Sequence, residues 1–124
     1  MGAYRLDFYE QTCQLTITLE GDWDYKEARA YQAALMEYVK NRSVEKVLID
    51  QRRARFDPKC MELFAENRDI YELKSSATAA VLSRSDYRDL RESMEALPAE
   101  SMQDAPKPFD TIEGAQKYLS NLSY

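Results

Sequence analysis

The chain has 124 residues, with 17 Lys and Arg against 22 Asp and Glu, and a formal net charge of −5. With 44% hydrophobic and 31% charged residues, it has the size and balance of one soluble globular domain, expected to span 1–124. The acidic total argues against a nucleic-acid partner, and no apolar run approaches the ~20 residues of a membrane span, so we expect no integral membrane contact.

The residue types also exclude some kinds of chemistry. The chain has no histidine, and its three glycines are too scattered for a phosphate-binding loop. No zinc or calcium spacing is present, so we expect no metal and no cofactor. Cys13 and Cys60 are far apart and predict a reducing, cytoplasmic setting, in which both pack as small apolar side chains. The alternative is a reactive Cys60 thiol, with its pKa lowered by Arg55 and Lys59.

The N-terminal residues predict an antiparallel hairpin. Residues 4–9 and 13–19 alternate apolar and polar side chains, and residues 10–12 are a short connection between them. Gly21 and Asp22 are expected to end the second strand.

From residue 24 to 40 the period changes to three and four, which predicts a helix capped by Asp22 or Asp24. Its apolar face consists of Ala28, Tyr31, Leu35, Tyr38 and Val39. The compact apolar run at 45–50 then predicts a central strand that is covered on both faces.

The second half predicts alternating helices and strands. Asp57 and Pro58 form a helix-start signal, followed by an apolar stripe of Cys60, Leu63, Phe64 and Tyr71. Residues 76–82 fit helix or strand by composition, and their length favours a strand. A third helix capped by Ser85 would bury Tyr87, Leu90, Met94 and Leu97.

The C-terminal part begins with an acidic, proline-rich loop at 98–108, after which Phe109 is a strand remnant at best. Asp110 is expected to cap the last helix in a capping box. The buried face of that helix would consist of Ala115, Tyr118, Leu119 and Leu122.

The order of these elements predicts a single-domain α/β fold. An N-terminal antiparallel hairpin is followed by alternating strands and helices, which gives a mixed four- to five-stranded sheet with about four helices. Sheets of this kind bind ligands at the carboxyl ends of their strands, where the strand order reverses.

Several motifs in this order resemble those of SpoIIAA-like proteins of the STAS superfamily, including an uncharacterised STAS/SEC14-like branch. They are the Tyr-Arg-Leu-Asp-Phe hairpin start at 4–8, Leu-Glu-Gly at 19–21, Lys-Val-Leu-Ile-Asp-Gln-Arg at 46–52, Asp-Ile-Tyr-Glu-Leu at 69–73 and the Phe-Asp-Thr-Ile-Glu-Gly-Ala-Gln-Lys-Tyr-Leu segment at 109–119. The similarity spans nearly the whole chain and implies a STAS-like fold.

The resemblance also implies a function. Regulatory members of the superfamily bind protein partners and are switched by phosphorylation of a serine in an Asp-Ser-Ser-Gly-like turn, at the start of the helix after the central strand. The matching stretch here reads Asp57-Pro58-Lys59-Cys60 and contains no serine. We therefore expect a STAS-like module that lacks the usual phosphorylatable serine.

The sharpest local feature lies between the central strand and the following helix. Over residues 45–59 there are five basic residues against three acidic ones, within a chain that is acidic overall. Arginine side chains and backbone N–H groups at a helix start can hold a carboxylate or phosphate. The candidate ligand-binding residues are Asp50, Arg52, Arg53, Asp57 and Lys59. The alternative is a solvated loop that pairs with the acidic helices.

Three functions follow in order of preference. The first is a non-enzymatic protein-interaction or regulatory module with an unidentified protein partner. The second is a carrier of a small apolar or anionic ligand in the crevice near Asp50, Arg52 and Arg53. The third is an enzyme of unknown chemistry, for which the sequence offers no catalytic residues: Ser83-Arg84-Ser85-Asp86 lacks the glycines and the histidine of a nucleophile turn. A pocket with converging polar groups favours the second, and a flat apolar patch, as in a homodimer, favours the first.

Overall fold

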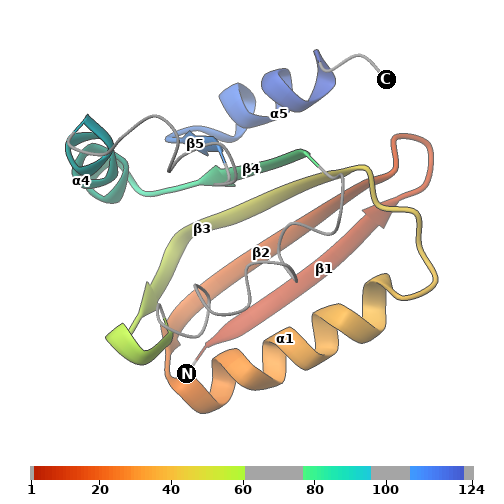
Figure 1. Ribbon diagram of the computed structural model, residues 1–124, viewed down its shortest axis with the longest axis horizontal. Coiled ribbons are helices and arrows are strands. Elements are labelled where there is room, and N and C mark those ends of the chain that lie inside the picture. Colours follow the sequence, from red (N-terminus) through yellow and green to blue (C-terminus); the bar gives the residue numbers. More distant parts are fainter. Residues whose placement is uncertain (1, 61–76, 96–106, 122–124) are drawn as a thin grey trace.

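The computed structural model, which describes residues 2–60, 77–95 and 107–121, begins with the predicted antiparallel hairpin (Figure 1). Strand β1 (Ala3–Tyr9) pairs with β2 (Gln14–Trp23) from Ala3↔Glu20 to Tyr9↔Gln14. Cys13 closes the turn with a left-handed backbone (φ 53°). The alternation of side chains therefore places one face of the hairpin in the core, as the sequence predicts.

Strand β2 is longer than the sequence suggested, because Gly21 and Asp22 do not end it. Gly21 adopts φ 85°, which a glycine reaches without steric strain, and the pairing shifts register between Thr18 and Glu20. The irregularity is absorbed within the ladder, and pairing continues to Trp23.

Helix α1 (Tyr25–Val39) follows the predicted period. Asp24 is the N-cap: its Oδ1 accepts a hydrogen bond from the Glu27 N–H at 2.8 Å, which settles the choice between Asp22 and Asp24. The buried face contains the predicted Ala28, Tyr31 and Leu35, and also Gln32.

Strand β3 (Lys46–Phe56) is the central strand and is covered on both faces. Val47 and Ile49 belong to the core under α1, whereas Leu48 belongs to a second core. The prediction that this strand ends at Asp50 is wrong, because β3 keeps pairing with β2 as far as Trp23↔Phe56. A helix begins at Pro58, as predicted; the rest of its apolar stripe lies outside the described residues.

The remaining elements complete a sheet in the order β1-β2-β3-β4-β5. Strands β4 (Ala77–Val81) and β5 (Lys107–Phe109) run parallel to β3. The predicted strand at 76–82 is confirmed, and the predicted loop at 98–108 overlaps β5, which Phe109 ends. The described strands lie in the sheet in the same order as in the chain. Among them the strand order therefore does not reverse, and the expected ligand crevice at such a reversal is not formed.

Helices α4 (Arg84–Glu95) and α5 (Ile112–Ser120) are capped by residues other than the predicted Ser85 and Asp110. The Ser83 hydroxyl, and not that of Ser85, accepts from the Asp86 N–H at 3.3 Å. The Thr111 hydroxyl, and not the Asp110 carboxylate, accepts from the Gly114 N–H at 3.1 Å. In each helix the capping hydroxyl accepts a hydrogen bond from the backbone N–H three residues later, which is the usual N-cap geometry.

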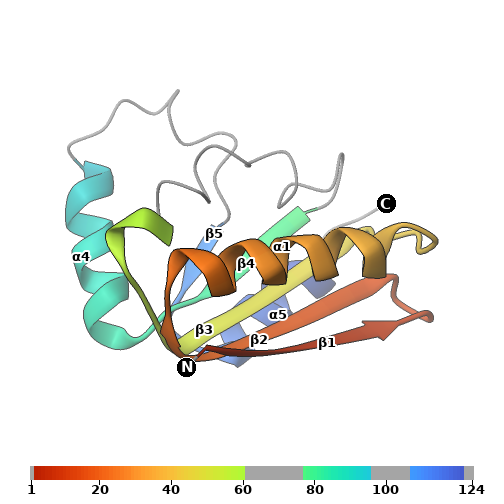
Figure 2. The ribbon, with the colours of Figure 1, turned by 90° about the horizontal axis from the view of Figure 1, so that it is seen from below.

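Two hydrophobic cores lie on opposite faces of the sheet, where Figure 2 shows α1 and α5. The core under α1 contains the aromatic cluster of Trp23 and Tyr31, whose ring centroids are 5.5 Å apart. The core under α5 contains Leu48, Val81, Ala115 and Leu119. Within the described part of the chain, no helix is long and apolar enough to cross a membrane.

Candidate functional site

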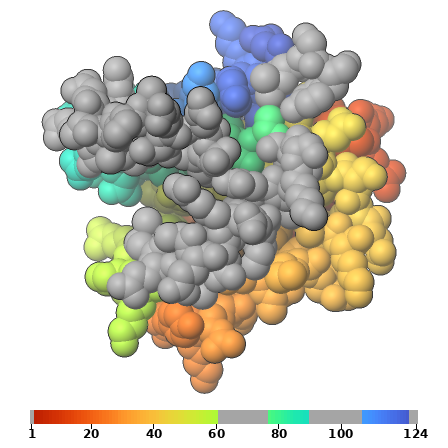
Figure 3. Space-filling view, viewed as in Figure 1, coloured from red at the N-terminus to blue at the C-terminus, as the bar shows by residue number. Residues whose placement is uncertain are grey.

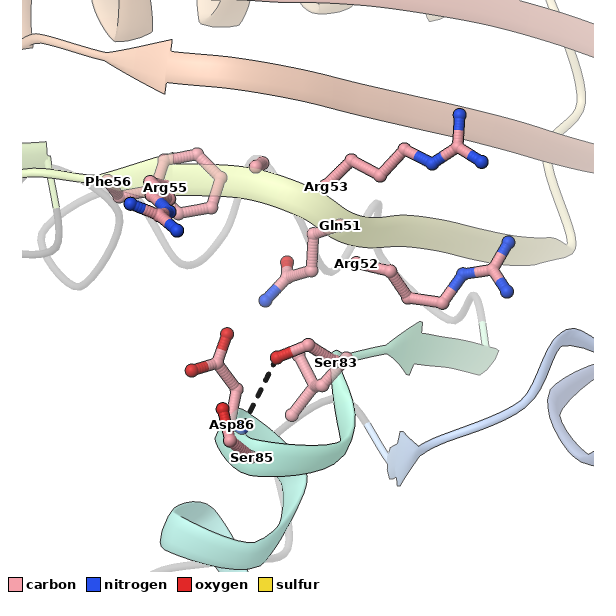
Figure 4. Close-up of a pocket in the computed structure, with 10 residues that line it drawn as sticks. Gln51, Arg52, Arg53, Arg55, Phe56, Ser83, Ser85 and Asp86 are labelled. Atoms are coloured by element: carbon pink, nitrogen blue, oxygen red, sulfur yellow. Dashed lines mark hydrogen bonds between the residues drawn. The ribbon is translucent and has the colours of Figure 1, made fainter.

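A cavity lined by described residues lies at the carboxyl ends of β3 and β4 and has a volume of about 890 Å³ (Figure 4). Gln51 extends from β3 toward Ser83 and Asp86, which lie at the start of α4. The described lining residues come from these two elements and the short segment between β4 and α4: Gln51, Arg52, Arg53, Ala54, Arg55, Phe56, Leu82, Ser83, Ser85 and Asp86.

The cavity exists because β3 continues where β4 ends. Val81, the last residue of β4, pairs with Asp50. After it the Leu82 N–H donates to the Phe109 carbonyl at 2.8 Å, and Ser83 caps α4, so the chain turns away from β3. In Figure 3 the surface is hollowed between α4 and the segment that leaves β3.

Asp50 and Arg52 form a bidentate pair at this point of divergence. The Arg52 Nε and Nη2 atoms donate to the two carboxylate oxygens of Asp50 at 2.9 and 3.0 Å, and the Arg52 backbone N–H donates to Oδ1 at 3.3 Å. This hydrogen bonding raises the pKa of Arg52 above its ordinary value, and the carboxylate of Glu113 adds to the effect. The pair is held in one geometry, so Arg52 has little capacity left for a ligand.

Arg53 and Arg55 are the arginines of the cavity lining whose charge remains available to a ligand or partner. The Arg53 side chain is 81% exposed and lies 3.9 Å from the Glu20 carboxylate, a surface ion pair of small energy. Arg55 is exposed, and no described carboxylate forms an ion pair with it. Among the described lining residues, Asp86 is the acidic one.

The predicted site residues Asp57 and Lys59 serve a different purpose. The Asp57 carboxylate caps the helix that begins at Pro58 by accepting from the Cys60 N–H at 3.0 Å. This hydrogen bond lowers the pKa of Asp57, with a further contribution from Lys59. Neither residue is among the described lining residues of the cavity. Of the five predicted site residues, Arg52 and Arg53 line the cavity, Asp50 pairs with Arg52 beside it, and Asp57 caps a helix.

Cys60 is a buried core residue with a thiol that stays protonated at neutral pH. Its Sγ–H donates to the Trp23 carbonyl at 3.3 Å, and burial, followed by the Asp57 carboxylate, raises the pKa of the thiol to about 11. The arginine and lysine that could have activated it do not lower its pKa. The interpretation of Cys60 as a small buried side chain therefore fits the structure, whereas that of a reactive thiol does not.

Sequence reasoning missed the part of the cleft that comes from the start of α4. The sequence predicted Ser85 as a helix cap and offered residues 83–86 as a nucleophile turn, whereas the Ser83 hydroxyl is the one that caps α4. A usable signal was present: carboxyl ends of neighbouring parallel strands meet at one edge of a sheet, so residues after 81 had to approach those after 50. Among the described residues, no group of three acidic or cysteine side chains could hold a metal ion.

No protein-family model and no curated protein sequence matches the chain. Solved structures do match. The anti-sigma factor antagonist SpoIIAA in its unphosphorylated form is 17% identical, with a TM-score of 0.59 over 97% of this chain and 100% of that one. An anti-sigma factor antagonist from Mycobacterium paratuberculosis is 14% identical, with a TM-score of 0.65 over 98% and 96%.

A third match is an uncharacterised protein from Shewanella loihica PV-4, described as having a SpoIIAA-like fold. It is 12% identical, with a TM-score of 0.60 over 95% of this chain and 93% of that one. Together the three likenesses show that the chain has a SpoIIAA-like fold, as the sequence motifs implied.

Proposed function

We propose that the chain is a non-enzymatic, STAS-like interaction module that binds a protein partner through the cleft at the ends of β3 and β4. The supporting observation is that two arginines lining this cleft, Arg53 and Arg55, are exposed and carry charge that the pair of Asp50 and Arg52 does not use. Exposed arginines around a concave surface are typical of protein contacts, in which Arg is enriched. Two solved structures of the same fold are named anti-sigma factor antagonists, which supports a regulatory role.

The module would act without the phosphoserine switch. At the helix start after β3, the chain offers Asp57, Pro58, Lys59 and Cys60, none of which carries a hydroxyl. Asp57 accepts from the backbone N–H of Cys60, and the Cys60 side chain is buried. We infer that partner binding here is controlled by partner concentration or by a modification elsewhere, in the reducing cytoplasm that two free cysteines suit.

A second candidate function is binding of a small anionic ligand in the same cleft. The observation in its favour is the cavity of about 890 Å³, which lies in the range of small-molecule sites and has polar groups on both walls. A third candidate arrangement is a homodimer. It would use the exposed Tyr4, Tyr9, Tyr25 and Met36 on β1 and α1.

Affinity capture from native lysate, paired with native mass spectrometry, tests the proposal. We expect a defined protein partner that the double variant Arg53→Ala/Arg55→Ala fails to retain. The control is Arg42→Ala, which removes one arginine charge beyond the far end of α1, where Arg42 stacks on Tyr38. Co-purification of a small anion with the wild-type chain, and of no protein, would transfer the assignment to the second candidate. Equal capture by both variants would contradict the proposed surface.

A further inference from the structure

We infer that the part of β3 beyond Asp50 is a strand-addition site for an extended acidic segment of the partner. This inference rests on the proposed function and names the chemistry that the partner presents. It starts from the unequal lengths of two neighbouring strands. Strand β4 pairs only with Lys46 to Asp50 of β3, whereas β2 pairs with β3 as far as Phe56.

From Gln51 to Arg55, β3 therefore has β2 on one side and no described strand on the other. Alternate residues of a strand direct their N–H and C=O groups to the same side, so this edge offers backbone donors and acceptors to another strand. The carboxylate of Asp50 accepts from the Arg52 N–H, so the exposed edge begins beyond that residue. The cavity of about 890 Å³ occupies the place where β4 would have continued.

The side chains along this edge select for negative charge. Arg53 and Arg55 are two residues apart, so they project to the same face of the sheet. On the occupied side, β2 places Glu20 opposite Arg53 and Asp22 opposite Arg55. An added strand with acidic residues at alternate positions would repeat this pairing on the other side, where cross-strand pairs of opposite charge are favourable. Asp86, across the cleft, disfavours a densely acidic segment over an alternating one.

The other long strand edge of the sheet, β1, fits an acidic segment less well. Its one arginine, Arg5, forms an ion pair with Asp7 of the same strand at 3.0 Å. A hollow beside this pair has a volume of about 300 Å³, and its lining includes the acidic Asp7 and Glu20. The β1 edge thus provides the control: Arg5→Ala removes one arginine charge from a competing strand edge.

Selection from a random heptapeptide library on the whole chain tests this inference. We expect peptides with Glu or Asp at alternate positions. Affinity for a selected peptide should fall by about tenfold in Arg53→Ala/Arg55→Ala, because each exposed pair contributes a modest amount. Arg5→Ala should change affinity by less than about twofold. The fluorescence of Trp23, the single tryptophan, can report binding. Phe56 lines the cavity, and its ring centroid lies 6.0 Å from that of Trp23.

Backbone N-methylation of the selected peptide at alternate residues separates strand addition from a contact through side chains alone. If the peptide adds to β3 as a strand, N-methylation of the residues whose N–H groups face β3 should lower affinity by about tenfold or more, although the acidic side chains are unchanged. Selection of no acidic peptide, or equal affinity of the methylated peptide, would overturn the inference. If affinity capture still retains a partner through Arg53 and Arg55, the proposed function survives that result; if capture fails as well, both are wrong.

Discussion

Gln14 and Gln116, 102 residues apart in the chain, exchange two hydrogen bonds through their side-chain amides. The Gln14 amide donates at 2.9 Å and the Gln116 amide donates back at 3.0 Å, which ties the start of β2 to α5. Gln14 is 5% exposed, so its amide depends on this partner and on Thr16. The polar contact thus joins α5 to the start of β2, in addition to the apolar packing of Ala115 and Leu119 against Leu48 and Val81.

Gln116→Ala should lower the free energy of unfolding by about 1–3 kcal/mol, because it leaves the buried Gln14 amide without its main partner. Replacing both glutamines by methionine should recover part of that loss, since no unpaired amide remains. Urea unfolding measures both effects. Gln11→Ala, in the exposed turn, is the control, and equal stability of the Gln11 and Gln116 variants would show that the amide pair is unimportant.

Cys60 should resist thiol reagents in the folded protein. Because its pKa is raised to about 11, the thiolate is scarce at pH 8, whereas Cys13 is half-buried in a turn. In a Cys13→Ser variant, we expect a disulfide reagent to label the folded chain slowly and the urea-unfolded chain rapidly. Rapid labelling of the folded variant would contradict a protonated, buried thiol.

The same thiol makes stability depend on alkaline pH. Above about pH 9 an unfolded cysteine ionises while the buried one stays protonated, so the folded state binds more protons. The free energy of unfolding should therefore fall between pH 9 and about 11. Cys60→Ala should show a shallower fall than the wild-type chain in this window, and identical slopes would argue against the raised pKa.

Asp57 should stabilise the helix start after β3 in its ionised form. Its pKa is lowered by the Cys60 N–H, so its contribution is present above the ordinary carboxyl pKa and is lost as pH falls through the lowered value. Asp57→Ala should lower the melting temperature, and Asp57→Asn, which keeps a capping oxygen, should lower it less and remove the acid dependence. Asp110→Ala, at an exposed position that does not cap α5, should have little effect.

Gly2→Ala should disturb the aromatic cluster. A Cβ at this position would lie 2.5 to 2.9 Å from three atoms of the Trp23 indole, closer than carbon atoms pack. We expect a shifted tryptophan emission and a loss of about 1–3 kcal/mol of stability, as for other overpacked sites. Unchanged emission and melting would mean that the N-terminal residues move aside without strain.

The sequence predicted the elements of the fold better than their ends. Period and composition located the hairpin, α1, the central strand and β4, because each has a buried face that repeats along the chain. They failed at Asp50 and at Gly21, where β3 and β2 continue past polar or flexible residues. Pairing with a neighbouring strand, which no local pattern reveals, decides where a strand ends.

The same limitation explains the division of the predicted site. Arg52 and Arg53 were expected in one loop with Asp57 and Lys59, just past a strand that ends at Asp50. The extension of β3 to Phe56 places both arginines within the strand instead. The capping role of Asp57 follows from its Asp-Pro pair and was predicted. The wall of the cleft that α4 supplies could be found only by combining strand order with the position of residues after Val81.

The most direct test of the proposed binding surface is amide NMR of the labelled chain, titrated with the protein that it retains most strongly from native lysate. The account predicts that shifts and line broadening concentrate on residues 51–56 and 83–86. Perturbations confined to β1 and α1, around Tyr9 and Met36, would contradict it.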